Sequence, residues 1–447
     1  MKSPLMPFDD ALAALLARAA PVSGVERVAT LEADGRVLAE PQRSTMNVPA
    51  ADNTQMDGYA VRCADLVARG AGEGGPAADG QAGGATEPAL RLRVAQKILA
   101  GHPGSPLEPG TAARIFTGAN IPEGADAVVM QEQAQADGDH VVILHRPQPG
   151  EWIRRTGEDI REGGVILEEG ARLTPQATGL AASIGLASLP VRRRVRVACF
   201  FTGDELVMPG EPLPPGAIYN SNRFFLGTLL RRLGCEVTDL GIVPDSLEAT
   251  RAALREAATG HDLVLTSGGV SVGEADHVKP AVQAEGSLDL WQIAIKPGKP
   301  LAYGRVRRAA GAGAKGAAVR GSAAAEGPAT EDQDFAHFIG LPGNPVSSFV
   351  TFLLLVRPFV LRLQGARDTA PQAFPMRADF DWPRPDKRRE FLRVRVNAQG
   401  GLELFPNQGS AVLTSTVWAD GLVDNPAGQR IARGDVVRFL PMAGLLG

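Results

Sequence analysis

Five short loops of this sequence carry the residue types that bind oxyanions and hard cations. They are 202–205 (TGDE), 244–245 (PD), 266–276 (TSGGVSVGEAD), 296–300 (KPGKP) and 341–348 (LPGNPVSS). Backbone N–H groups of glycine-rich turns are typical donors to phosphate-like anions, and lysine side chains add positive charge. Carboxylates are the ligands that Mg²⁺ prefers. Anion donors beside carboxylates therefore predict metal-assisted phosphate chemistry.

The candidate side chains fall into three sets. The glycine-rich loop supplies anion donors at Ser267, Gly268, Gly269, Ser271 and Gly273. The bent KPGKP loop supplies the paired cations Lys296 and Lys299. The candidate ligands of a divalent cation are Glu205, Asp245 and Asp276.

Each feature also has a purely structural interpretation. A Gly-Gly pair is commonly a turn, Asp245 is well placed to cap a helix, and lysines in a loop are often simply solvated. What favours function is that all five loops fall on one edge of one predicted sheet.

The region 191–367 must position these loops, and it alternates strand and helix. Predicted strands are RVRVACFF, CEVTDLGIV, 263–265, WQIAI and FIGL. Predicted helices are 223–233 with Gly234 as its C-cap, a segment capped by Asp245 with Glu248 three residues on, 277–284, and 346–363. The strands are apolar on both faces, which is typical of a parallel sheet covered on both sides. Ligands of such sheets bind beyond the carboxyl ends of the strands, where the strand order switches.

The flanking regions are rich in β-strand patterns. Short Val/Ile runs between residues 90 and 190 predict short strands, and REFLRVRV and GLELFPN alternate in period two, which predicts a small antiparallel C-terminal domain. The stretches 69–89 and 308–334 consist mainly of Gly, Ala, Pro and charged residues and are predicted to be flexible surface loops. A second dense motif, PAADNTQMDGYAV, places Asp52, Asn53, Asp57 and Tyr59 together, either as turn caps or as ligands.

Composition narrows the class of protein. A chain of 447 residues suggests about three domains, and a net charge of −4 argues against general nucleic-acid binding. The cysteines Cys63, Cys199 and Cys235 form no CxxC pair, which indicates no disulfide framework and favours a reducing cytoplasm, with Cys199 and Cys235 as buried apolar residues.

The N-terminal segment is predicted to be an amphipathic helix and not a signal peptide. Asp9 and Asp10 cap it, Leu12, Leu15 and Leu16 recur with helical spacing, and Arg18 interrupts any apolar run. No run is expected to approach the roughly 20 apolar residues of a membrane span.

With these motifs in place, the chain resembles the molybdopterin molybdenumtransferase family. The matching segments occur in family order from near residue 48 to near residue 411. They are PAADNTQMDGYAV, RIFTGANIPEGADAVVMQE, RRTGEDIREGG, FTGDEL, IYNSN, LGIVPDS, TSGGVSVGEADHVK, IKPGKPLAYG, GLPGNPVSS, REFLRV and NQGSA.

The resemblance implies an α/β multidomain fold with four domains. An elongated dimerisation domain would comprise 1–45 and 150–190, with a β-rich domain, 46–149, inserted into it. A doubly wound α/β molybdopterin-binding domain would cover 191–367, and a small C-terminal β-barrel would cover 368–447. The family is dimeric, which implies a homodimer with each active site near the subunit interface.

The resemblance also implies the reaction. Adenylylated molybdopterin and molybdate would be the substrates, Mg²⁺ the cofactor and AMP the leaving group. Asp245 and Asp276 match catalytic or metal-organising acids, with Glu205 nearby, and Asp57 and Asp159 match further catalytic acids of the family that reach a neighbouring subunit's site. The positions matching oxyanion or cofactor binding are Thr202, Gly203, Lys296, Lys299, Pro300, Ser347, Arg388, Arg393 and Ser410.

Two alternatives stay open at this point. A molybdopterin adenylyltransferase, which performs the preceding step, uses the same α/β domain but lacks the N-terminal and C-terminal motifs. The second alternative is a scaffold that keeps the fold and binds partner proteins. The adenylyltransferase of the same pathway is also a candidate partner. The 308–334 stretch lies between two loops of the predicted site in sequence and, if ordered, could control access to it.

Overall fold

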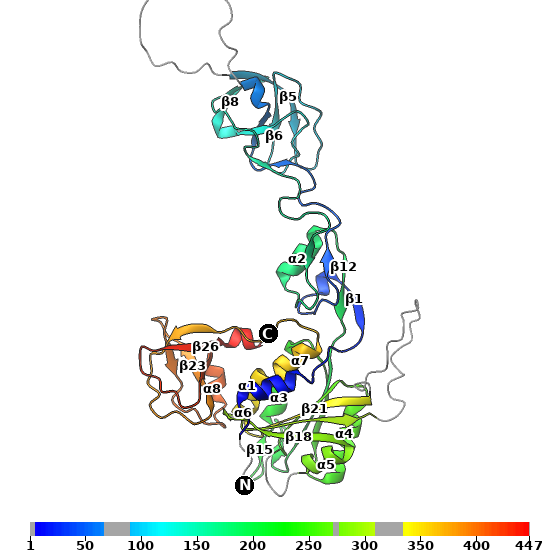
Figure 1. The fold of residues 1–447 in the computed structure, drawn as a ribbon, viewed down its shortest axis with the longest axis vertical. Coiled ribbons are helices and arrows are strands. Elements are labelled where there is room, and N and C mark those ends of the chain that lie inside the picture. Colours follow the sequence, from blue (N-terminus) through cyan, green and yellow to red (C-terminus); the bar gives the residue numbers. More distant parts are fainter. Residues whose placement is uncertain (1–4, 67–89, 271–276, 309–333, 447) are drawn as a thin grey trace, which may run out of the picture. The chain divides into compact units, whose positions relative to one another are not determined.

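The structure is a computed structural model that describes residues 5–66, 90–270, 277–308 and 334–446. The chain forms two compact units (Figure 1). The first comprises 1–40, 169–178 and 187–447, and the second comprises 41–168 and 179–186. The boundaries of the four predicted domains stay a prediction. The stretch 69–89 and nearly all of 308–334 lie outside the described residues.

A six-stranded mixed sheet forms the centre of the first unit. Its strand order is β16-β13-β17-β21-β20-β18. The parallel strands are β13 (Arg196–Thr202), β16 (Glu236–Val243), β17 (Leu263–Ser267) and β21 (Phe335–Leu341). The antiparallel strands are β20 (Pro300–Arg307) and β18 (Gly286–Gln292). Strand order switches at β13, which lies between β16 and β17, so the sheet is doubly wound there.

The antiparallel edge corrects the expectation of an all-parallel sheet. Only residues 293–299 connect β18 to β20, which is too short for a parallel crossover connection but long enough for a reversal. The predicted single strand WQIAI is also wrong. Its first part ends β18 at Gln292, and Ile295–Lys296 form a separate strand, β19, that pairs with the C-terminal domain.

Helices cover both faces of this sheet, as predicted (Figure 1). Alternate residues of β13 explain why: Val197, Cys199 and Phe201 enter one core, whereas Ala198 and Phe200 enter the other. The first core packs against α3 (Ser221–Arg232) and the helical run 345–363, and the second packs against α4 (Leu247–Ala258) and α5 (Val278–Glu285).

The start of α4 differs from the prediction in a way that matters for the site. The N-cap is Ser246, whose side chain accepts a hydrogen bond from Ala249 N at 3.2 Å. Asp245, the predicted cap, precedes it. Since a serine hydroxyl caps a helix as well as an aspartate does, Asp245 is left available for another role.

The helical run 345–363 comprises α6 (Pro345–Thr351), a π-helical segment (Phe352–Val356) and α7 (Arg357–Leu363). By length and composition, its 19 residues could cross a membrane, contrary to the expectation that no such run exists, but 94% of its most apolar window is buried within the protein. We therefore assign it to the core of the first unit. Helix α1 (Phe8–Leu16) packs against the same core through Phe8, Ala11 and Leu15. It begins after Pro7, with Asp9 and Asp10 in its first turn and not at its cap.

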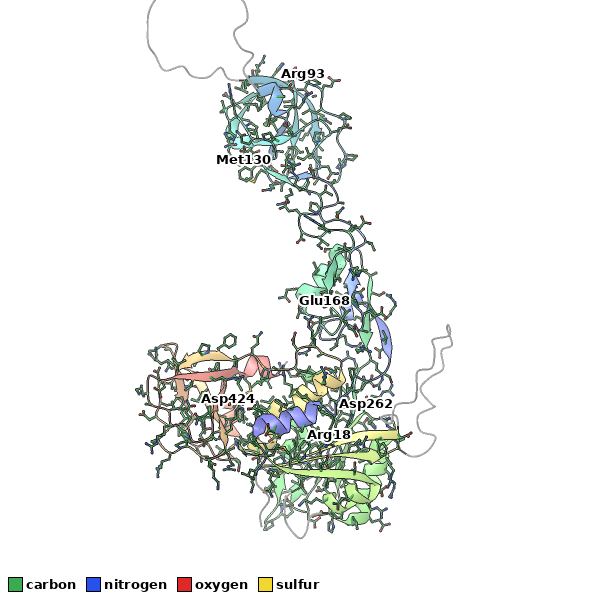
Figure 2. All side chains as sticks on the ribbon, in the orientation of Figure 1. Arg18, Arg93, Met130, Glu168, Asp262 and Asp424 are labelled. Atoms are coloured by element: carbon green, nitrogen blue, oxygen red, sulfur yellow. The ribbon has the colours of Figure 1, made fainter. Side chains whose placement is uncertain are left out.

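The C-terminal segment forms a small closed β-domain. Strands β22 (Phe374–Arg377), β23 (Arg389–Val396), β24 (Leu402–Leu404), β25 (Gly421–Asn425) and β26 (Val436–Pro441) are antiparallel neighbours. A bridge between Ala378 and Leu402 joins the two ends, which bears out the predicted barrel. Asp424 lies within this domain (Figure 2) and accepts two 2.6 Å bonds from Arg389. Short helices α8 (Thr414–Trp418) and α9 (Met442–Leu446) complete the segment.

The remaining elements are short strands and turns. In the second unit, β4 (Gly58–Val61), β5 (Leu90–Ile98), β6 (Thr111–Ile115), β7 (Ala127–Met130), β8 (Ala134–Asp137) and β9 (His140–Ile143) form one sheet. This confirms the short strands predicted after residue 90. Three further strand pairs are antiparallel: β2 (Gln42–Arg43) with β11 (Val165–Leu167), β3 (Asn53–Thr54) with β10 (Ile153–Arg154), and β1 (Val25–Ala29) with β12 (Ser188–Arg192). One pair is parallel, β14 (Leu206–Val207) with β15 (Ile218–Tyr219). Helix α2 spans Pro175–Ser183.

Candidate functional site

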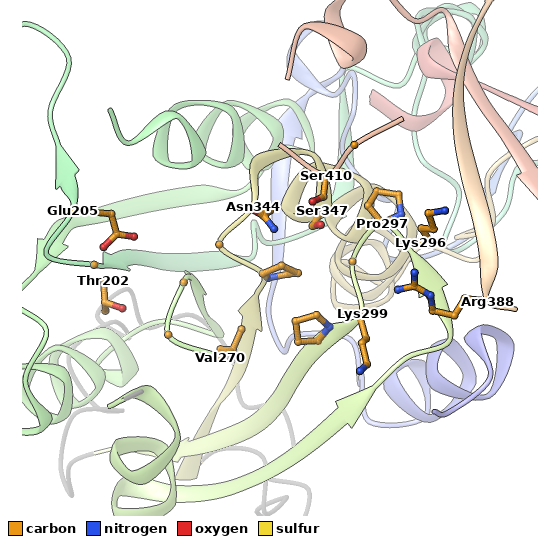
Figure 3. Close-up of a pocket in the computed structure, with 18 of the residues that line it drawn as sticks. Thr202, Glu205, Val270, Lys296, Pro297, Lys299, Asn344, Ser347, Arg388 and Ser410 are labelled. Carbon is orange, nitrogen blue, oxygen red and sulfur yellow. The ribbon is translucent and has the colours of Figure 1, made fainter. Parts of the chain in front are cut away.

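A cavity of about 700 Å³ lies at the carboxyl ends of β13 and β17, where the strand order switches (Figure 3). All five predicted loops contribute to its wall. Among the predicted site residues, the following line it: Thr202, Gly203, Glu205, Asp245, Gly268, Gly269, Lys296, Lys299, Pro300, Ser347, Arg388 and Ser410. The C-terminal domain supplies Arg388 and Ser410, so two domains of the first unit build one pocket.

The backbone around β17 explains the glycine-rich loop. Gly268 has φ +98°, and a Cβ atom at this position would lie 2.7 Å from the Thr202 carbonyl oxygen. Glycine is required there because it alone combines this dihedral angle with so close an approach. Gly343, on the facing loop, has room: its Cβ would lie 3.8 Å from the nearest atom, the Gly268 Cα.

These two glycines make a matched pair for a stability test. We expect Gly268→Ala to lower the free energy of unfolding by roughly 1–3 kcal/mol, since a non-glycine residue would be strained there. Gly343→Ala should change it by less than about 0.5 kcal/mol. Urea denaturation of both variants measures the difference, and equal stability of the two would show that the close approach to Thr202 is not a constraint.

Two of the three cations that line the cavity are held by carboxylates. Lys296 Nζ lies 3.0 Å from Glu390 Oε1 and 3.6 Å from Asp386 Oδ2. Arg388 donates from Nε to Asp386 Oδ1 at 2.9 Å and from Nη2 to Asp386 Oδ2 at 2.8 Å. The hydrogen bonds from Arg388 hold the pKa of Asp386 well below its usual range, and Asp386 in turn raises the pKa of Arg388.

Lys299 differs from these two cations. Within the described part of the chain it has no ion pair and no side-chain hydrogen bond, although it lines the same cavity. In Figure 3 its amine extends away from that of Lys296, while the guanidinium of Arg388 points toward the loop that carries both lysines. Lys299 is therefore the cation whose charge is least compensated before a ligand arrives.

Two of the three predicted cation ligands reach the cavity. Glu205 and Asp245 both line it, and neither carboxylate has a hydrogen bond or ion pair to another described residue. The third acid, Asp276, lies outside the described residues, as do Ser271 and Gly273. Among the residues that are described, no group of three or more His, Cys, Asp and Glu side chains could hold a metal ion.

Ser267 lies beneath the surface of the cavity. It is 3% exposed, and its hydroxyl donates to Pro342 O at 2.8 Å and accepts from Asn222 Nδ2 at 2.8 Å. These bonds tie the end of β17 to the loop before α6. Ser267 and Asn222 line an adjoining cavity of about 620 Å³ that shares Thr202, Glu205, Gly268, Gly343 and Asn344 with the first.

Arg393, a predicted oxyanion contact, does not line either cavity. It is 1% exposed and donates to the carbonyl oxygens of Phe391 and Gly409 at 3.2 and 3.3 Å. Burial lowers its pKa to about 10. Its backbone also exchanges two hydrogen bonds with the Gln408 side chain. Arg393 thus supports the 408–410 segment, which does line the cavity.

Asp57 and Asp159 belong to the second unit. Asp57 accepts bonds from Thr117 N at 2.8 Å and Thr117 Oγ1 at 2.7 Å, and the backbone bond is the main cause of its lowered pKa. Asp159 lines a separate cavity of about 490 Å³ with Val48, Pro49, Asn53, Arg154 and Glu158. Both are acids on surfaces of their own unit.

The cavities are also lined by residues that were not predicted as site residues, among them Pro297, Asn344, Gln408 and Asn222. Asn222 ends the IYNSN motif at the start of α3, and Asn344 is the N-cap position of α6. An asparagine near the start of a helix can be recognised in the sequence, but asparagine is also commonly found there simply as a helix cap.

Together, the fold and the pocket define a class of protein. The cavity at the switch point of this doubly wound sheet contains three cations, glycine turns and two carboxylates that have no partner among the described residues. This combination is typical of an enzyme that acts on oxyanions.

Comparison with known proteins specifies the family. Three family models match in order along the chain: the MoeA N-terminal region (domain I and II) over residues 6–185, a probable molybdopterin binding domain over 198–362, and the MoeA C-terminal region (domain IV) over 375–442. The chain is 39% identical to the molybdopterin molybdenumtransferase of Haemophilus influenzae, with 93% of each chain covered. It is 34% identical to that of Bacillus subtilis, with 91% of this chain and 86% of the relative covered.

A solved structure agrees. The molybdopterin biosynthesis moeA protein from Pyrococcus horikoshii OT3 matches with a TM-score of 0.77 and 26% identity, covering 98% of this chain and 100% of that one. The chain belongs to the molybdopterin molybdenumtransferase family, as its motifs predicted.

Proposed function

We propose that this enzyme inserts molybdenum from molybdate into adenylylated molybdopterin with release of AMP. Family membership supports the transfer of molybdenum to molybdopterin. The observation that carries the proposal is that one cavity is lined both by the cations Lys296, Lys299 and Arg388 and by the carboxylates Glu205 and Asp245, which have no partner among the described residues. Figure 3 shows Glu205 and the three cations in this cavity. Both substrates need this combination, because molybdate and the phosphoanhydride are oxyanions.

The residues of the cavity take distinct roles in this proposal. Lys299 and Arg388 donate to molybdate oxygens, with Ser347 and Ser410 as neutral donors on the same wall. The backbone of Thr202, Gly203, Gly268 and Gly269 lies close to the adenylylated molybdopterin, since a glycine-rich turn lets an anionic group approach the main chain. Cleavage of the anhydride then depends on positioning and on neutralising the charge of the departing AMP.

Glu205 and Asp245 fit a Mg²⁺ ion. Mg²⁺ is commonly held by one or two carboxylates plus substrate phosphates and water, and both acids face the cavity without another partner among the described residues. Bound there with Asp276, the ion would neutralise charge on the phosphoanhydride.

The wider setting is also part of the proposal. We propose a cytoplasmic homodimer that receives its substrate from the adenylyltransferase of the same pathway. Asp57 and Asp159, which lie in the second unit, would contribute to the site of the other subunit.

One experiment separates this proposal from the adenylyltransferase alternative. The full chain is incubated with adenylylated molybdopterin, or with free molybdopterin and ATP, each with and without molybdate and Mg²⁺. We expect AMP release from the first substrate that depends on molybdate, and no ATP consumption with the second. ATP consumption with free molybdopterin would instead establish the adenylyltransferase. No turnover with either substrate would favour the scaffold.

A further inference from the structure

The guanidinium of Arg388 is fixed by a single neighbouring carboxylate. Asp386 accepts from Arg388 Nε and Nη2, and its Oδ1 also accepts from the Arg388 backbone N at 3.0 Å. Three bonds between residues two positions apart set both the backbone turn and the plane of the guanidinium. Nη1 donates to none of the described residues, so it is left for a ligand in the cavity that Arg388 lines.

Lys296 is fixed by Glu390, a carboxylate of β23, which begins just after Arg388. Lys296 of β19 and Glu390 of β23 are register partners in a parallel pair, so their side chains lie on the same side of the sheet. Glu390 is fully buried, and besides Lys296 it accepts from Trp382 Nε1 at 2.7 Å and Asp386 N at 3.1 Å. These contacts join the KPGKP loop to the C-terminal domain.

Lys296, Arg388, Asp386 and Glu390 form one network of ion pairs, in which Asp386 contacts both cations. Its Oδ2 accepts from Arg388 at 2.8 Å and lies 3.6 Å from Lys296 Nζ. It does not itself line the cavity. A carboxylate in this place has two opposite effects on an incoming anion: it repels the anion through its charge, and it holds the cations in the geometry that binds it.

We propose that Asp386 is a positioning residue of the oxyanion site, which aligns Arg388 for the molybdate that the proposed function assigns to this cavity. For the affinity of the anion, the alignment of Arg388 by Asp386 outweighs the repulsion between Asp386 and the anion. The negative charge of Asp386 is already neutralised by Arg388. An arginine without these two hydrogen bonds to Asp386 would have to be ordered each time the anion binds.

The test is direct binding of molybdate alone to the full-length protein, measured by equilibrium dialysis with elemental analysis of molybdenum. We expect Asp386→Asn to weaken binding about tenfold, as for the loss of an aligned charge-assisted hydrogen bond. Asp386→Glu, which keeps the carboxylate, should remain within about threefold of wild type. In an Arg388→Ala background, Asp386→Asn should have no further weakening effect, because there is no guanidinium left to align.

Asp379→Asn is the matched control. Asp379 forms the same kind of fork with Arg377, two residues away at 2.8 and 3.0 Å, but neither lines the cavity. It should bind molybdate as wild type does. The inference is overturned if Asp386→Asn binds molybdate as tightly as wild type or more tightly, or if it weakens binding equally with and without Arg388.

Two other causes of weak molybdate binding can be distinguished from a wrong inference about Asp386: misfolding of the variant, and failure of the proposed function itself. If Asp386→Asn is unfolded by circular dichroism, Arg388→Lys replaces it. Lysine keeps the charge but cannot be held in a fork, so about tenfold weaker binding is expected and unchanged binding overturns the inference. If wild type itself shows no saturable binding of molybdate, both the inference and the proposed molybdate site are wrong. Binding by wild type with no effect of the variants contradicts the inference alone.

Discussion

Lys299→Ala is expected to raise the molybdate concentration needed for half-maximal AMP release by about 10- to 100-fold. Hydrogen bonds to charged groups contribute about 1.5–3 kcal/mol, and Lys299 is the cation of the cavity whose charge is not already shared with a carboxylate among the described residues. Lys296 and Arg388 each have such a partner, so removal of either also disturbs the network around Asp386 and Glu390.

The measurement is the rate of AMP release at a series of molybdate concentrations. Lys387→Ala is the matched control, because Lys387 is an exposed lysine next to Arg388 that does not line the cavity. It removes the same charge from a neighbouring loop of the C-terminal domain, beside the cavity residue Arg388. Equal effects of the two substitutions would mean that general electrostatic attraction, and not a contact from Lys299, draws molybdate to the site.

Asp245→Asn is expected to lower the rate of AMP release about 100-fold or more at saturating substrates. A divalent cation supplies on the order of several kcal/mol of charge stabilisation during anhydride cleavage. Among the described residues of the cavity, Asp245 is one of two carboxylates without a hydrogen bond or ion pair. Because the amide is a poorer ligand for Mg²⁺, the Mg²⁺ concentration for half-maximal rate should rise as well.

Asp204→Asn provides the comparison for Asp245. Asp204 is an exposed acid beside Glu205 that does not line the cavity, and its replacement should leave the rate and the Mg²⁺ dependence unchanged. If Asp245→Asn retains the wild-type rate with the same Mg²⁺ dependence, then Asp245 does not hold the ion, and the carboxylate role would fall to other residues.

The case of Asp245 also illustrates what the sequence could and could not predict. Its position after β16 and before α4 follows from hydrophobic periodicity, and that placement is correct. Whether Asp245 or Ser246 caps the helix could not be decided, since both residue types cap equally well and helix ends are uncertain by one or two residues. The structure assigns the cap to Ser246 and leaves Asp245 in the cavity.

Local patterns identified the strands of the central sheet better than their pairing. Apolar runs located β13, β17 and β21, but the direction of β18 and β20 depends on how the short segment 293–299 turns, which no periodicity records. The pairing of Lys296 with Glu390 is a contact across 94 residues of sequence and was not predicted.

The same limit applies to Arg393. Arg388 and Arg393 belong to one basic motif, and nothing in their spacing shows that the first faces the cavity and the second faces the interior of the β-domain. Likewise, the insertion 308–334 is adjacent to the site in sequence. In the structure, however, Arg308 and Asp334 lie at the opposite end of β20 and β21 from Pro300 and Leu341. The two described ends of the insertion, Arg308 and Asp334, therefore lie at the end of the sheet remote from the cavity.

The central claim is that anhydride cleavage and molybdenum transfer are coupled in this cavity. The most direct measurement incubates wild type with adenylylated molybdopterin, molybdate and Mg²⁺, and determines both the AMP released and the molybdenum that co-purifies with the pterin. The account predicts equal molar amounts of the two, and AMP release that nearly stops when molybdate is omitted. AMP released at the full rate without molybdate, or without molybdenum in the pterin fraction, would contradict it.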